Sequence, residues 1–136
     1  MKKENKILVI GIFVMLCLNF FGSIASRTFD INYSYLSPLS FILYVLIGYL
    51  TSKKQNLKTG VFFATILGFT ESTLGSLVAK IFGEPNIGNF QIEMTMGVWI
   101  FTITMVTIMA AFSGLIGAVI ARSLKKKSNK NSMGKQ

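Results

Sequence analysis

One acidic residue, Glu71, stands near the middle of a long apolar stretch between residues 60 and 82. A carboxyl group at that depth in a bilayer costs about 2.5–3.5 kcal/mol on insertion scales, so acids inside membrane helices are rare and often mark proton or cation sites. Two roles stay open for Glu71. It could bind and release a proton or a cation, or it could stay protonated and donate an interhelical hydrogen bond worth about 0.6 kcal/mol.

Hydroxyl and amide side chains are the groups that could share a site with this acid. Thr107 and Thr104 come from the fourth apolar stretch and Asn19 from the first. The candidates for a proton- or cation-binding site are therefore Glu71, Thr107, Thr104 and Asn19, with Thr70, Ser72 and Thr73 as further hydrogen-bond partners beside the acid.

Other chemistry is excluded by the residue types that the chain lacks. It contains no His and one Cys, Cys17. A Cys/His metal site and a disulfide framework need more ligands or partners than this. Catalysis by a serine or cysteine nucleophile lacks its histidine base. We therefore expect no catalytic residues, no metal, no cofactor and no enzymatic activity.

Four apolar stretches, at residues 7–26, 33–52, 60–82 and 97–121, would have to position these side chains. Each is close to the roughly 20 residues that a helix needs to cross a bilayer. The chain is 51% hydrophobic and 14% charged, against about 25% charged in soluble domains. We predict an all-α integral membrane bundle of four transmembrane helices over residues 1–124. The basic, polar segment 125–136 is expected to be a disordered cytoplasmic tail.

The first two stretches leave alternatives open. Pro38 interrupts the second, and Ser37 with Pro38 would suit a helix start, which gives a short crossing. The first has a basic start, an apolar core and small residues at Ser23 and Ala25. A cleaved signal peptide is therefore the alternative to a first span.

Lys and Arg are concentrated at the N-terminus, between the second and third stretches, and after the fourth. Because cytoplasmic segments carry an excess of Lys and Arg, both termini are expected in the cytoplasm. The expected location is a bacterial plasma (inner) membrane, as a multi-pass protein. The net charge of +9 is spread over the stretch ends and forms no basic face, so nucleic-acid binding is not expected. Contact of the tail with anionic lipid is a second role for it.

Small residues recur on one side of the third and fourth stretches. Small residues allow close approach of helices in lipid, so a tight antiparallel hairpin is expected, with Gly68 near Ala111, Glu71 near Thr107 and Gly75 near Thr104. The same stripes could instead serve a homodimer. The stripes are Gly60, Ala64, Gly68, Glu71, Gly75 and Ala79 in the third, and Gly97, Ile100, Thr104, Thr107, Ala111, Gly114, Ala118 and Ala121 in the fourth.

The segment from Gly48 to Lys54, followed by Lys58, Thr59 and Gly60, resembles small uncharacterised four-helix bacterial membrane proteins over the second and third stretches. Those families have no assigned activity. Glu71 with Gly75 and Lys80 also resembles the acid, glycine and lysine of small multidrug resistance exporters. In those exporters the acid lies in the first helix, whereas here it lies in the third.

Together these features favour a small multi-pass membrane protein without enzymatic activity. It would act through helix–helix association, either as a homo-oligomer or with another membrane protein. The alternative is a small proton- or cation-coupled transporter that uses Glu71. A pore former of the holin kind is a third hypothesis that fits the number of spans and the basic tail.

Overall fold

The computed structural model describes residues 3–32, 35, 37–75, 77 and 95–133, and the regular structure of this part is helical throughout. The expected all-α class is confirmed. The helices in chain order are α1 (Lys3–Thr28), α2 (Ser37–Lys54), α3 (Leu57–Thr70), the π-helical turn η2 (Glu71–Gly75) that continues α3, and α5 (Met96–Met133).

The starts of α2 and α3 follow from local chemistry. Pro38 lies in the first turn of α2, where its missing N–H costs no helical hydrogen bond. Asn56 is the N-cap of α3, and its side-chain oxygen accepts a hydrogen bond from the Thr59 backbone N–H at 2.9 Å. Only Gln55 and Asn56 separate α2 from α3, so the two helices form a tight antiparallel pair.

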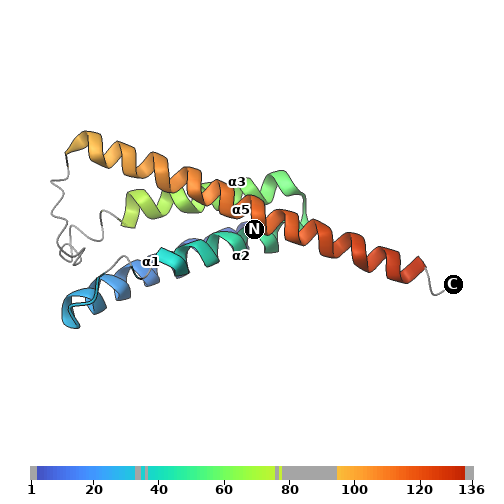
Figure 1. The fold of residues 1–136 in the computed structure, drawn as a ribbon, viewed down its shortest axis with the longest axis horizontal. Helices are drawn as coiled ribbons and strands as arrows, with labels where there is room; N and C mark the ends of the chain where they lie inside the picture. Colours follow the sequence, from blue (N-terminus) through green and yellow to red (C-terminus); the bar gives the residue numbers. More distant parts are fainter. Residues whose placement is uncertain (1–2, 33–34, 36, 76, 78–94, 134–136) are drawn as a thin grey trace.

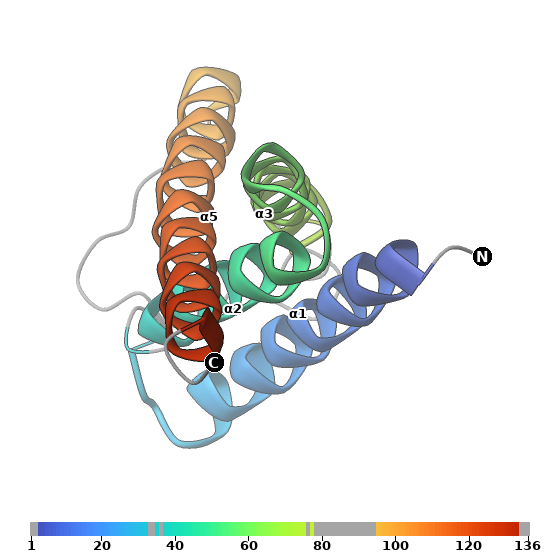
Figure 2. The ribbon, with the colours of Figure 1, turned by 90° about the vertical axis from the view of Figure 1, so that its right-hand side faces the viewer.

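Consecutive helices alternate in direction (Figure 1). The beginning of α1, the turn between α2 and α3, and the C-terminal part of α5 lie toward one end of the bundle. The end of α1 and the beginning of α5 lie toward the other. Viewed along the bundle, α2 lies between α1 and α5 and also contacts α3 (Figure 2). The same end therefore carries Lys6 from the start of α1, Lys53 and Lys58 from beside the α2–α3 turn, and Arg122 from the C-terminal part of α5.

Within the described residues, two helical segments, Asn5–Thr28 and Met96–Lys126, are long and apolar enough to cross a membrane. In each of them, 28% of the most apolar window is buried inside the bundle. The remainder exposes bulky apolar side chains such as Phe13 and Phe112. Apolar exposure on this scale is uncommon on soluble monomers and is typical of surfaces that face lipid or another protein.

Glycine backbones form the closest contacts between α2, α3 and α5. A Cβ atom added at Gly48 would lie 2.8 Å from the Gly114 Cα, and one at Gly117 would lie 2.8 Å from the Tyr49 backbone nitrogen. A Cβ at Gly114 would collide with the Cβ of Ala64. The three helices approach this closely because there is no side chain between them, which is how small residues promote association in membranes.

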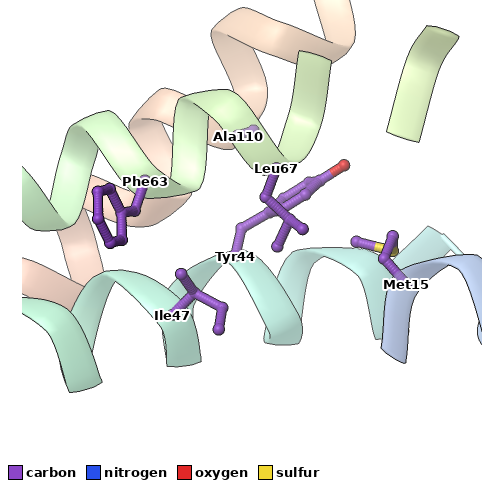
Figure 3. Packing of buried hydrophobic residues seen from close by; sticks show 6 residues of the cluster. All are labelled: Met15, Tyr44, Ile47, Phe63, Leu67 and Ala110. Carbon is purple, nitrogen blue, oxygen red and sulfur yellow. The ribbon is translucent and has the colours of Figure 1, made fainter. Parts of the chain in front are cut away.

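An apolar cluster lies beside this contact (Figure 3). It holds α1, α2, α3 and α5 together around the Tyr44 ring, which is 2% exposed. The cluster consists of Met15, Tyr44, Ile47, Phe63, Leu67 and Ala110.

The expected stripe on the fourth helix is found in its second half. Gly114, Ala118 and Ala121 are buried, whereas Gly97, Ile100 and Thr104 are exposed. Gly68 lies against Ala110, one position before the expected Ala111, and a Cβ at Gly68 would be 3.6 Å from the Thr107 Cα. The stripe contacts α2 as well as α3, because Gly114 and its neighbour Gly117 both meet the α2 backbone.

Two further expectations concern the ends of the stretches. The segment 125–136 was expected to be disordered, but α5 continues through its basic residues to Met133. No Gly or Pro interrupts the chain between Ala118 and Met133, and Lys is a good helix former, so the helix has no local reason to stop.

Parts of two predicted stretches lie outside the described residues. These are residues 33, 34 and 36 of the second stretch, and residues 76 and 78–82 of the third, which include Ala79.

Candidate functional site

Glu71 lies at the junction of α3 and η2, and its carboxyl group faces α2. Ser40 Oγ donates a hydrogen bond to Glu71 Oε1 at 2.8 Å, and the Tyr44 hydroxyl donates to Oε2. Each carboxyl oxygen thus has a hydroxyl partner, and both partners come from α2. Ser40 and Tyr44 are four residues apart, so they lie on the same face of α2 one turn apart.

The Tyr44 side chain joins the apolar cluster to the acid. Its ring lies beside Leu67, and its hydroxyl points away from the cluster toward the end of α3 (Figure 3). Phe41 contacts the ring edge-to-face, with the centroids 6.3 Å apart. A buried tyrosine needs a hydrogen-bond partner for its hydroxyl, and Glu71 provides it. The packing of the ring therefore fixes where the hydroxyl meets the carboxyl group.

The π-helical turn begins at Glu71 itself. Ser72 Oγ lies 3.0 Å from both the Gly68 and Phe69 carbonyl oxygens, and Thr73 Oγ1 donates to the Phe69 carbonyl at 2.8 Å. These hydroxyls compete for carbonyls that would otherwise accept only backbone N–H groups, and such competition loosens a helix locally. Single π-turns inside α-helices are rare and often occur at functional sites.

Helix α1 contributes Met15 and Asn19 to the surroundings of Glu71. Met15 Sδ lies 3.9 Å from Ser40 Oγ. Asn19 is buried, donates to the Met15 carbonyl at 3.0 Å, and lies against η2, where a Cβ at Gly75 would be 3.4 Å from Asn19 Nδ2. Met15, Asn19, Ser40, Tyr44 and Glu71, which we call the Glu71 cluster, thus join α1, α2 and η2.

The residues expected from the sequence contribute unequally to the cluster. Asn19 and Gly75 meet next to the turn that carries the acid. The Thr104 and Thr107 hydroxyls instead donate to the carbonyls of Ile100 and Ile103 in their own helix, at 2.9 and 2.7 Å.

Thr70, Ser72 and Thr73 likewise bond to carbonyls of their own helix. Ser40 and Tyr44 were not predicted from the sequence as partners of Glu71. The pair of hydroxyl residues at spacing four on α2 is the signal that could have indicated them.

The cluster places a neutral hydroxyl group on each carboxyl oxygen of Glu71, with the Met15 thioether beside Ser40 and the Asn19 amide beside Gly75. Within the described residues, no three His, Cys, Asp or Glu side chains come together to hold a metal ion. Two hydroxyl donors can compensate a negative carboxylate, and carboxyl and hydroxyl oxygens are ligands that hard cations accept. Because a hydroxyl can also accept a hydrogen bond, the same site can hold a protonated carboxyl group.

No protein-family model, curated protein or solved structure matches this chain. What the chain does must therefore be inferred from the Glu71 cluster and from the surfaces around it.

Proposed function

We propose that this chain is a multi-pass protein of a bacterial plasma membrane, with four spanning helices and both termini in the cytoplasm. Helix α2 has 18 residues, about 27 Å at 1.5 Å per residue. Helices α3 and η2 follow each other directly, with 14 and 5 residues, about 28 Å in total. Both lengths are close to the roughly 30 Å hydrocarbon core. Phe13, Ile42, Phe62 and Phe112 give each of the four an exposed apolar side chain.

The orientation leads to a prediction about topology reporters. A reporter fused after Gln136 or inserted after Gln55 should be active only in its cytoplasmic form, because Lys and Arg accumulate at that end of the bundle. An insertion after Phe29 serves as the control and should be active only in the exported form. An exported signal from the fusion at Gln136 would overturn the orientation.

Within that membrane protein, we propose that the Glu71 cluster exchanges a proton or a small cation, without enzymatic activity. The observation that carries this proposal is the pairing of both Glu71 carboxyl oxygens with hydroxyls of another helix. A change of charge at the carboxyl group would change both interhelical hydrogen bonds at once. Binding at Glu71 is thereby coupled to the contact between α2 and the π-turn.

The distribution of the glycines also favours exchange over association through the small-residue stripes. Gly48, Gly68, Gly114 and Gly117 each meet atoms of another helix of the same chain where a side chain would stand. These positions are occupied inside the monomer, so they are not free to bind a second protein. The carboxyl group, by contrast, is only partly buried.

Flux across vesicles tests the proposed exchange. Purified protein in proteoliposomes with a trapped pH dye should collapse an imposed proton gradient faster than empty vesicles. Parallel vesicles with trapped Na⁺ or K⁺ indicators separate proton from cation movement. If no ion moves faster than in empty vesicles, the exchange proposal fails.

Association with a second copy is the other candidate, and one surface favours it. In the first half of α5, Ile100 and Thr104 are exposed, and no described atom lies within 4 Å of a Cβ at Gly97. This half continues the small-residue stripe beyond its contacts with α2 and α3.

Cross-linking would detect such a dimer. In a Cys17→Ala background, Thr104→Cys should give a disulfide-linked dimer in membranes. Ile116→Cys, exposed on another face of α5, should not. Equal yields from the two positions, or no dimer from Thr104→Cys, would exclude this surface.

A further inference from the structure

A groove of about 510 Å³ runs between α2 and the C-terminal half of α5. Its lining includes Phe41, Ile42, Leu46 and Tyr49 from α2, and Ile120 and Leu124 from α5. Except for the Tyr49 hydroxyl, these side chains are apolar. Ile42, Leu46, Ile120 and Leu124 are between 43% and 63% exposed, so the groove opens at the surface of the bundle.

The length of the groove fits one leaflet of a bilayer. Along α2 it extends from Phe41 to Tyr49, a rise of about 12 Å at 1.5 Å per residue. Half of a hydrocarbon core is about 15 Å. Tyr49 lies near the C-terminal end of α2, which is the basic end of the bundle. The groove therefore runs from the middle of the proposed membrane region to its basic boundary.

Positive charge lies at that boundary. The Lys53 Nζ is 5.9 Å from the centroid of the Tyr49 ring, and Lys53 follows Tyr49 by one turn on the same face of α2. Lys125 directly follows Leu124, and both lysines are exposed. No acidic residue occurs between Lys53 and Lys58 or after Glu93. An apolar groove with Lys53 at its basic end, and with Lys125 directly after a lining residue, matches a molecule with an apolar chain and an anionic head.

We propose that this groove holds an acyl chain of an anionic phospholipid, with Lys53 and Lys125 at its phosphate head group. The proposal rests on the proposed membrane placement, with this end of the bundle at the cytoplasmic leaflet. It is independent of the Glu71 cluster. It also differs from general attraction of a basic tail to a membrane, because it requires a particular groove and a particular lysine beside it.

A tryptophan in the groove can report which lipid lies there. In a Trp99→Phe background, Tyr49→Trp provides a single indole, which brominated lipids quench when they touch it. The full-length protein is placed in vesicles that contain either brominated phosphatidylglycerol or brominated phosphatidylcholine. We expect the anionic lipid to be preferred by at least about five-fold, the effect of one basic residue near an anionic surface.

Two lysine variants in the same background make the test specific. Lys53→Gln should reduce the preference by about five-fold, and Lys53→Arg should retain it. Lys58→Gln removes the same charge at the same end of the bundle, but on α3 and outside the groove, and should leave the preference unchanged. An equal loss in Lys53→Gln and Lys58→Gln would show only general attraction and would overturn the proposal.

The remaining outcomes separate this proposal from the proposed exchange. Equal quenching by both lipids would show that the groove faces lipid without selecting it, which overturns the proposal and leaves ion flux untouched. Quenching by neither lipid would mean that protein covers the groove, and this also overturns it. Flux through the Glu71 cluster is measured in separate vesicles, so a loss there would not alter the lipid preference.

Discussion

Replacing Gly114 by Leu is expected to separate α5 from both α2 and α3 and to lower the free energy of unfolding by about 3 kcal/mol or more, the upper range for overpacking. The Gly114 backbone is what a Cβ on Gly48 would meet, at 2.8 Å from the Cα. On its other side, a Cβ on Gly114 would collide with Ala64. Neither neighbour can move aside by a side-chain rotation, because Gly48 presents only backbone and Ala64 presents a methyl group bonded directly to its Cα.

Unfolding in detergent micelles by titration with dodecyl sulfate, followed by circular dichroism, measures this loss. Gly97→Leu is the matched control, since it makes the same change on the same helix where no described atom lies within 4 Å. Phe112→Leu, at a side chain that is 65% exposed, should change the unfolding free energy by less than about 0.5 kcal/mol. If Gly97→Leu destabilised the protein as much as Gly114→Leu, the close contact would not be the cause.

Replacing Glu71 by Gln is expected to abolish proton or cation flux while the bundle stays folded. The amide is nearly isosteric with the carboxyl group but cannot exchange a proton or carry a negative charge. One of the two hydroxyls, Ser40 or Tyr44, can donate to the amide oxygen, and the other can accept from the amide N–H₂. Both hydroxyls therefore keep an interhelical partner, one of them with donor and acceptor exchanged, so the fold survives while the exchangeable proton and the negative charge are lost.

Further variants at the cluster separate exchange from structure. Glu71→Asp should retain part of the flux with a shifted pH profile. Glu71→Leu should cost less than about 2 kcal/mol of unfolding free energy, the range measured for interhelical hydrogen bonds in membranes. Flux is compared across pH in proteoliposomes with matched protein content. A fully active Glu71→Gln protein would leave Glu71 with a structural role alone.

The sequence was sufficient to predict helices and the importance of small residues, because both depend on composition and spacing. The four stretches correspond to α1, α2, the α3–η2 pair and α5. The stripe on the fourth helix was predicted from regular spacing, and it includes Gly114, which lies against Gly48 of α2 and Ala64 of α3. Regular spacing missed Gly117, one position from the stripe, because α5 contacts two helices at once and its buried face is wider than a single seam.

The partners of Glu71 could not be predicted in the same way, since they depend on which helices are neighbours. The antiparallel hairpin expected from the small-residue stripes places Thr107 beside the acid. Its hydroxyl donates instead to the Ile103 carbonyl, which is always within reach in a helix. Ser40 and Tyr44 reach Glu71 because α2 and the α3–η2 pair run antiparallel from a two-residue turn, which brings the first turns of α2 to the end of α3.

The backbone contacts of Gly48, Gly60, Gly114 and Gly117 have a consequence for how the gene can vary. At Gly60, an added Cβ would be 2.6 Å from the Gly48 carbonyl oxygen, so all four glycines stand against main-chain atoms or an adjacent methyl or hydroxyl group. Any base change at the first or second position of a glycine codon introduces a side chain or a stop. Silent third-position changes are therefore the substitutions that these four codons tolerate, whereas codons for lipid-facing residues such as Phe112 can drift among many apolar alternatives.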